Sequence, residues 1–112
     1  MKDKNEKMHE MQILEQNLQN LLLQKQAFQI ELTETQSALK EIENSKDEVF
    51  KIVGQLMIKT DKAKIKEELL NKEKILSLRT KTLEKQDASL MERLNSIRDE
   101  IIQQRETTSK KQ

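Results

Sequence analysis

The densest apolar stretch of the chain surrounds its only glycine. Residues 49–59 have the sequence VFKIVGQLMIK, with Gly54 between two runs rich in β-branched and apolar side chains. Such runs favour short β-strands, and Gly54-Gln55 fits a two-residue type II′ turn, whose first residue needs a positive φ angle. The sequence therefore predicts a β-hairpin over residues 49–60.

This predicted hairpin is apolar on both faces, because alternate residues of a strand point to opposite sides. A two-stranded hairpin is marginally stable in water, and its uncovered edges pair readily with further strands. We therefore expect hairpins of other chains to complete it; in the alternative interpretation it folds back onto its own helices. The expected oligomerisation residues are Val49, Phe50, Ile52, Val53, Gly54, Leu56, Met57 and Ile58.

A heptad pattern precedes the hairpin and predicts a coiled-coil helix over residues 8–45. Its 3-4 spacing never slips, which is typical of a long helix that packs against a partner helix. Residues 1–7 are polar and are expected to be frayed. The seam positions are Met11, Leu14, Leu18, Leu21, Lys25, Phe28, Leu32, Thr35, Leu39 and Ile42.

A second coiled-coil helix is predicted over residues 62–104, with Thr60-Asp61 as its N-cap. Residues 105–112 are polar and are expected to be disordered. One seam column is apolar and the other is largely polar. The first column is Leu69, Leu76, Leu83, Leu90 and Ile97, and the second is Lys66, Glu73, Thr80, Asp87, Leu94 and Ile101.

The two seams match each other across the hairpin. A tight hairpin makes the helices antiparallel, so facing residues should have numbers with a constant sum. The sum is 108 for Met11 with Ile97, Leu14 with Leu94, Leu18 with Leu90, Leu32 with Leu76, and Leu39 with Leu69. The fold predicted is mainly α: a long antiparallel two-helix coiled coil, joined by one β-hairpin, in a single domain spanning 1–112.

Two helices that pair with separate chains would not require the two seams to match across the hairpin, and this interpretation stays open. The middle layers are poorer, because Leu21 faces Asp87, Phe28 faces Thr80 and Thr35 faces Glu73. A coiled coil with polar seam residues on one of its two helices is expected to open locally at a modest cost in free energy.

Composition excludes several classes of function. Of the 112 residues 37% are charged, but the net charge is only +1, so no strong attraction to nucleic acid or membrane is expected. No window has the roughly 18 apolar residues that a membrane span needs. With no secretory signal visible at the start and no cysteine, the sequence predicts a soluble, cytoplasmic protein.

No pattern of catalytic or ligand-binding residues stands out. His9 has no second histidine and no cysteine with which to share a metal ion, and Gly54 has no glycine neighbours to form a phosphate-binding loop. No pair of carboxylates is set apart as an acid/base couple. We therefore expect no enzyme activity, no cofactor and no metal site.

The coil ends away from the hairpin carry apolar residues that suit a partner of variable shape. Methionine is flexible and polarisable, and the terminal layers of a coil fray easily. Leu14 and Leu94 are expected mainly to close the coil, whereas Ile13, Ile101 and Ile102, beside or beyond the seam, are expected to contact a partner. The candidate binding residues at these tips are Met8, Met11, Ile13, Leu14, Leu94, Ile97, Ile101 and Ile102.

The chain resembles the β-type subunits of prefoldin, and most closely the archaeal β subunit. The stretch 49–59 is similar to the strand–Val-Gly–strand signature of that family. Glu67-Glu68-Leu69 and residues 76–86, LSLRTKTLEKQ, are similar to its second-helix signature. The resemblance covers roughly residues 10 to 102 and is specific around the hairpin and the start of the second helix.

The resemblance implies a hexamer of two α-type and four β-type subunits, whose hairpins form an intersubunit β-barrel. The distal coil tips would hold unfolded proteins without ATP and deliver them to a group II chaperonin. No nucleotide, metal or covalent chemistry would take part. The alternative function is that of a structural or tethering coiled coil without client binding, and a nucleic-acid-associated role is the weaker third option.

Overall fold

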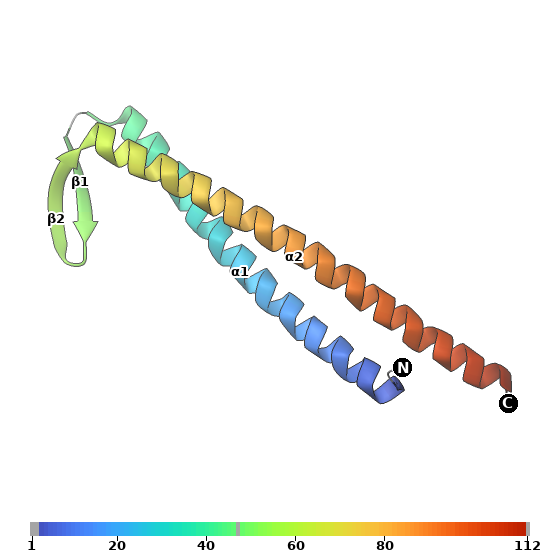
Figure 1. Cartoon of the computed structure of the whole chain (residues 1–112). Helices are drawn as coiled ribbons and strands as arrows, with labels where there is room; N and C mark the ends of the chain where they lie inside the picture. The colour runs from blue at the N-terminus through green and yellow to red at the C-terminus, as the bar shows by residue number, and fades with distance from the viewer. Residues whose placement is uncertain (1–2, 47, 112) are drawn as a thin grey trace. The chain divides into compact units, whose positions relative to one another are not determined.

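The fold is a helix–hairpin–helix, as predicted. The computed structural model describes residues 3–46 and 48–111, with the side chains of the last helix described as far as Arg105. Helix α1 (Lys4–Asn44) leads into strands β1 (Glu48–Val53) and β2 (Leu56–Asp61), and helix α2 (Lys62–Lys111) follows (Figure 1). The chain divides into two compact units, one formed by residues 1–25 with 82–112 and the other by residues 26–81.

Helix α1 begins earlier than the sequence analysis predicted. The side chain of Asp3 accepts a hydrogen bond of 2.8 Å from the backbone N–H of Glu6, which is the geometry of an N-cap. The expectation that residues 1–7 are frayed is therefore wrong from Asp3 onwards, and Met1 and Lys2 lie outside the described residues. The missed signal was the Asp3-x-x-Glu6 spacing of a capping box.

Helix α2 begins where predicted and ends later. The Asp61 carboxylate accepts a hydrogen bond from the N–H of Ala63 at 3.1 Å and so caps the helix. The helix then continues to Lys111, so the predicted end at Gln104 and the disordered tail are wrong up to that residue, and Gln112 is not described. The segment contains neither glycine nor proline, the residues that end a helix most strongly.

The unit formed by residues 1–25 and 82–112 has a core at the predicted register. Leu14, Leu94 and Ile97 are buried together. The predicted seam residues on either side of them pack against this cluster, which confirms the antiparallel pairing within one chain for this unit. These partly buried residues are Met11, Leu18, Leu90 and Ile101.

The unit formed by residues 26–81 keeps the seam but contains polar layers. Leu39, Ile42 and Leu76 are buried, and so is Thr35, which is 3% exposed. The Thr35 hydroxyl donates to the carbonyl oxygen of Glu31 at 2.8 Å, and Thr80 does the same to Leu76 at 2.9 Å. Each of these two hydroxyls is thus satisfied within its own helix, as buried polar groups must be.

One seam position was assigned to the wrong residue. Lys66 is exposed, whereas Ile65 is half-buried and occupies the inner face of α2 near the hairpin. The Lys66 amine instead lies 4.0 Å from the carboxylate of Glu43, at the outer edge of the coil. An α-helix with 3.6 residues per turn drifts from a strict 3.5-residue repeat, so the seam departs from the extrapolated heptad toward the start of α2.

Truncating a seam leucine to alanine should lower the stability of the fold far more than truncating an exposed leucine. Leu76 is 3% exposed, so Leu76→Ala should lower the free energy of unfolding by about 2 to 4 kcal/mol through lost burial and the cavity left behind. Leu70, 46% exposed on the same helix, is the control, and Leu70→Ala should cost less than about 1 kcal/mol. Urea unfolding measures both, and equal losses would contradict the register.

Candidate functional site

The hairpin turn has the conformation that the sequence predicted. Strands β1 and β2 pair in antiparallel register from Glu48↔Asp61 to Val53↔Leu56, which leaves Gly54 and Gln55 as the turn. Gly54 has a φ angle of 61°, and no other described residue has a positive φ. A positive angle at the first turn residue alone is the pattern of a type II′ turn, whose twist matches that of the strands.

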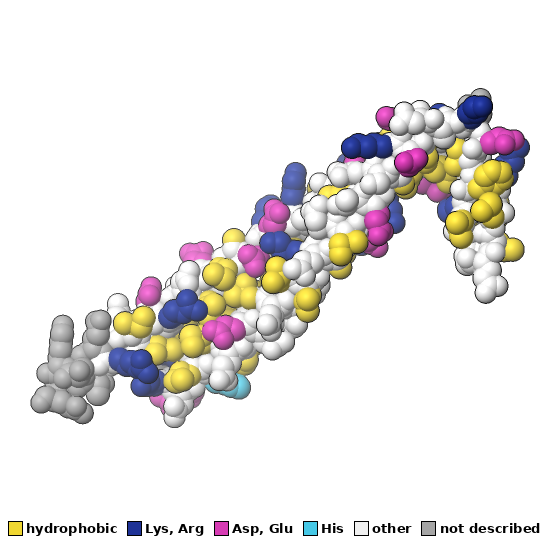
Figure 2. Space-filling model, turned by 180° about the vertical axis from the view of Figure 1, so that it is seen from behind, with side chains coloured by type: hydrophobic (Ala, Val, Ile, Leu, Met, Phe, Trp, Pro, Cys, Tyr) yellow, Lys and Arg dark blue, Asp and Glu magenta, His cyan; other side chains and the backbone are white. Residues whose placement is uncertain are grey.

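Toward the turn, one face of the hairpin carries large apolar side chains that are open to solvent. Cross-strand partners lie on the same face, so Ile52 lies beside Met57 and Phe50 beside Lys59. The exposed fractions are 71% for Ile52, 68% for Met57 and 51% for Phe50. Figure 2 shows hydrophobic side chains along this hairpin. Exposure of this extent in a grouped set of large apolar residues marks an interaction surface.

The other face is held to the helices only at its base. Val49 and Thr60 are half-buried there, and the Lys51 amine lies 3.3 Å from the Glu68 carboxylate of α2. Val53, Leu56 and Ile58, nearer the turn, stay about half to two-thirds exposed. The helices of the same chain therefore cover the base of the hairpin and leave its apolar end uncovered, against the fold-back interpretation.

Each strand of the hairpin has one unpaired edge. Within the described part of the chain the sheet consists of β1 and β2 alone. The outer edge of each strand presents backbone N–H and C=O groups that can pair with a further strand. Apolar faces and open edges together form a surface suited to strand addition from other chains.

The predicted tip residues divide into a buried and an exposed set. Leu14, Leu94 and Ile97 are 4–7% exposed, and Met11 and Ile101 pack against them, so these five residues close the coil. Three residues remain open to solvent at the same end of α1 and α2. They are Met8, Ile13 and Ile102, which are 42%, 48% and 47% exposed.

Two ion pairs border the buried cluster at this end. Arg93 donates from Nε to the Glu10 carboxylate at 3.0 Å and also from Nη2, and Lys7 lies 3.4 Å from Glu100. The Glu10 and Lys7 side chains are only 18% and 13% exposed. Sequence reasoning missed both pairs. The numbers of Lys7 and Glu100 sum to 107, one less than the sum of 108 that facing seam residues have.

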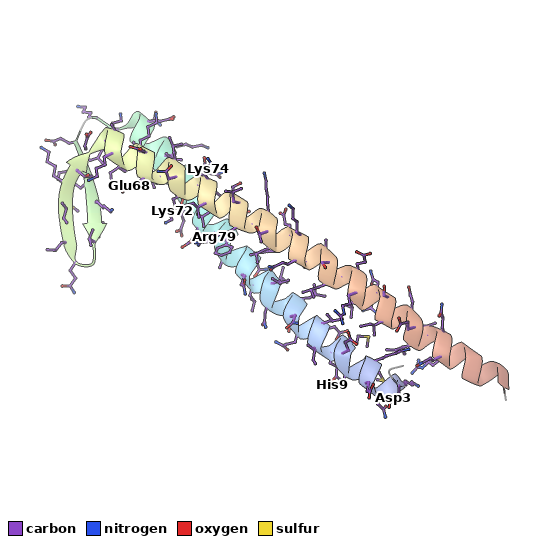
Figure 3. All side chains as sticks on the ribbon, in the orientation of Figure 1. Asp3, His9, Glu68, Lys72, Lys74 and Arg79 are labelled. Atoms are coloured by element: carbon purple, nitrogen blue, oxygen red, sulfur yellow. The ribbon has the colours of Figure 1, made fainter. Side chains whose placement is uncertain are left out.

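Among the residues that the structure describes, no group of three or more histidine or carboxylate side chains is placed to hold a metal ion. His9 is an exposed residue of α1 (Figure 3). Neither described helix has an apolar stretch of the length and hydropathy that crossing a membrane requires.

Most of the helix–hairpin–helix is similar in sequence to known proteins. A family model described as "Prefoldin subunit" covers residues 5–107. The chain belongs to the prefoldin family. The prefoldin subunit beta of Thermococcus onnurineus is 44% identical over 89 residues, which are 78% of this chain and 77% of that protein. The prefoldin subunit beta of Methanothrix thermoacetophila is 36% identical over 96 residues, which are 84% of this chain and 80% of that one.

A solved structure has the same fold. The crystal structure of the prefoldin beta subunit from Thermococcus strain KS-1 superposes with a TM-score of 0.81 at 38% identity, over 88% of each chain. The resemblance to β-type prefoldin subunits that the sequence predicted is thereby confirmed. Membership of this family implies a chaperone-type function, and the family is not one of enzymes.

Proposed function

We propose that this prefoldin chain is a β-type subunit of an ATP-independent holdase. In this proposal the chain assembles through its hairpin with α-type and further β subunits, as two α and four β in a hexamer. The distal coil tips hold unfolded proteins and deliver them to a group II chaperonin in the cytoplasm. No nucleotide, metal or covalent step takes part.

The hairpin is the observation that supports this proposal most strongly. Its apolar end is exposed on both faces, and both strands have open edges. Burying Ile52 and Met57 alone would remove a large part of their apolar area from water. Each Å² of apolar area removed stabilises the assembly by about 25 cal/mol. A tethering coiled coil would gain little from such an insert, so the hairpin favours an assembling chaperone over a simple tether.

The exposed residues at the tip support client binding there. Met8, Ile13 and Ile102 are apolar and accessible, and they surround a coil end whose core is already closed. Contacts made by such residues need no change in the fold. A surface of flexible and branched apolar side chains accepts many sequences, which is what unfolded proteins present.

A charge placed on the hairpin should prevent assembly without unfolding the helices. Ile52→Lys puts an ammonium group where assembly would bury an apolar residue, and an unpaired buried charge is strongly unfavourable. Gln55→Lys adds the same charge in the turn and is the control. Native mass spectrometry with a co-expressed α-type subunit should show the hexamer for wild type and Gln55→Lys, and free subunits for Ile52→Lys. A hexamer of Ile52→Lys would contradict hairpin assembly.

Polar substitutions at the tip should weaken client holding and leave the complex intact. The test variant is Ile13→Ser with Ile102→Ser, and the control is Leu22→Ser with Met91→Ser, whose side chains are 49% and 41% exposed in the same unit. The amount of complex that halves aggregation of a denatured protein, without ATP, should rise several-fold for the test variant alone. Equal protection by both variants would show that clients bind elsewhere.

A further inference from the structure

A groove with few charged groups lies in the unit formed by residues 1–25 and 82–112. It runs between the N-terminal half of α1 and the part of α2 beside it, blue and orange in Figure 1, and has a volume of about 620 Å³. This volume is within the range of ligand-binding pockets in proteins. We call it the neutral groove. The uncharged residues of its lining include Asn17, Asn20, Leu21, Gln24, Gln86 and Leu90.

Carboxamide side chains stand on both walls of the neutral groove. Asn17, Asn20 and Gln24 belong to α1 and Gln86 belongs to α2, and all four are exposed. None of these four groups forms a hydrogen bond with another residue that the structure describes. A carboxamide has two N–H donors and one carbonyl acceptor. Both walls therefore offer donors and acceptors that a ligand can use.

The floor of the neutral groove is apolar. Leu21 is buried and Leu90 is half-buried, so these two seam residues lie deepest among the leucines and amides of the lining. The exposed tip residues Met8, Ile13 and Ile102 do not line the groove. The neutral groove is therefore a surface separate from the apolar tip, with an apolar floor between amide walls.

The α1 wall belongs to the longest run of uncharged residues in the chain. Residues 16–24, QNLQNLLLQ, contain no charged side chain, although 37% of the residues of the protein are charged. Among the described residues that line the neutral groove, Lys85 alone is charged, and it is exposed. Burying a charged group without a partner is costly in free energy. An uncharged occupant can therefore enter this groove without covering a charge on its α1 wall.

One heptad nearer the tip, the same two stripes of the helices carry charges. Glu10 lies seven residues before Asn17 on α1, and Arg93 lies seven residues after Gln86 on α2. Glu10 and Arg93 form an ion pair that bridges the two helices. At the equivalent position inward, Asn17 and Gln86 line the neutral groove and form no such bridge. The change from charged to amide side chains thus leaves the groove open at this heptad.

We propose that the neutral groove binds an extended, uncharged segment of an unfolded client through hydrogen bonds to the client's backbone. The inference deepens the proposed function and rests on it. An extended chain presents N–H and C=O groups along both of its edges. In a chain that lies along the groove, Asn17 and Gln86 bond to opposite edges. Leu21 and Leu90 contact the side chains that point to the floor.

The length of the α1 wall fits about three residues of an extended client. Asn17 and Gln24 are seven residues apart, which is about 10 Å along a helix. An extended chain rises about 3.3 Å per residue. Every residue except proline offers a backbone donor and an acceptor, so this recognition does not depend on the client's sequence. Client peptide groups that bond to the amides also avoid the cost of burial without a hydrogen bond.

Disulfide trapping of a peptide tests the site directly, because the chain has no cysteine of its own. The probe is a short capped peptide of Ala, Val and Ser with one cysteine at its end. A second form of the probe carries N-methyl groups in place of its backbone N–H hydrogens. Ser89→Cys places a thiol in the lining of the neutral groove. Ala88→Cys, exposed and about 100° away around α2, is the matched control.

In the complex with the α-type subunit, Ser89→Cys should trap the unmethylated peptide at least several-fold more than Ala88→Cys. N-methylation should remove most of this difference, because it removes the donors that the amide walls bind. Each yield is divided by the yield of the same thiol with oxidised glutathione, which corrects for thiol reactivity. Equal trapping at the two positions, or equal trapping of the two peptide forms, would overturn backbone binding in the groove.

Filling the neutral groove should weaken client holding by the whole complex. Ser89→Arg extends a long side chain over the groove, and Ala88→Arg adds the same charge outside it. The amount of complex that halves aggregation of a denatured protein should rise several-fold for Ser89→Arg alone, with the helix content of both variants unchanged by circular dichroism. If the wild-type complex and Ser89→Arg protect equally, only the groove fails. If the wild-type complex does not suppress aggregation, the proposed function fails and the groove with it.

Discussion

The structure depends on one imbalance: the hairpin exposes more apolar surface and more backbone edge than its own chain can cover. The base is held by the Lys51–Glu68 ion pair and by a 2.9 Å hydrogen bond from Lys62 to the Ser45 carbonyl oxygen. Beyond that base, Ile52, Leu56 and Met57 are each about two-thirds exposed or more. A hairpin in this state is suited to pairing with partner strands, which is the basis of the proposed assembly.

The seam of the coiled coil, unlike the hairpin, buries its apolar residues within the chain itself. It buries enough leucine and isoleucine to hold two helices together, yet among the described residues no side chain falls below 2% exposure. Two of its polar positions are satisfied by hydroxyl groups that bond to their own helix. A thin core of this kind leaves the outer faces free, and these faces carry the exposed tip residues. The proposed function places assembly and client binding on surfaces that folding does not use.

Much of this could be predicted from the sequence because the signals are local and periodic. Heptad spacing gave the seam, and Gly54 between two apolar runs gave the turn and the strand register. The capping box at Asp3 was present but unnoticed, and Ile65 was overlooked because the heptad was extended as far as the hairpin. The heptad distinguished Leu14 from the adjacent Ile13 at the tip, and their burial differs accordingly. It did not reveal that Ile101, expected to contact a partner, packs against the Leu14 cluster. The Glu10–Arg93 pair joins residues 83 positions apart, which a local pattern cannot reveal.

The central claim is that other chains complete the hairpin, and hydrogen–deuterium exchange of its backbone amides tests this most directly. In the chain alone, the outward N–H groups of β1 and β2 should exchange quickly, because they bond only to water. With the α-type partner present, the same amides should become strongly protected, while the amides of the α1 and α2 mid-sections change little. Equally fast exchange in both samples, at concentrations where the complex is formed, would contradict the account.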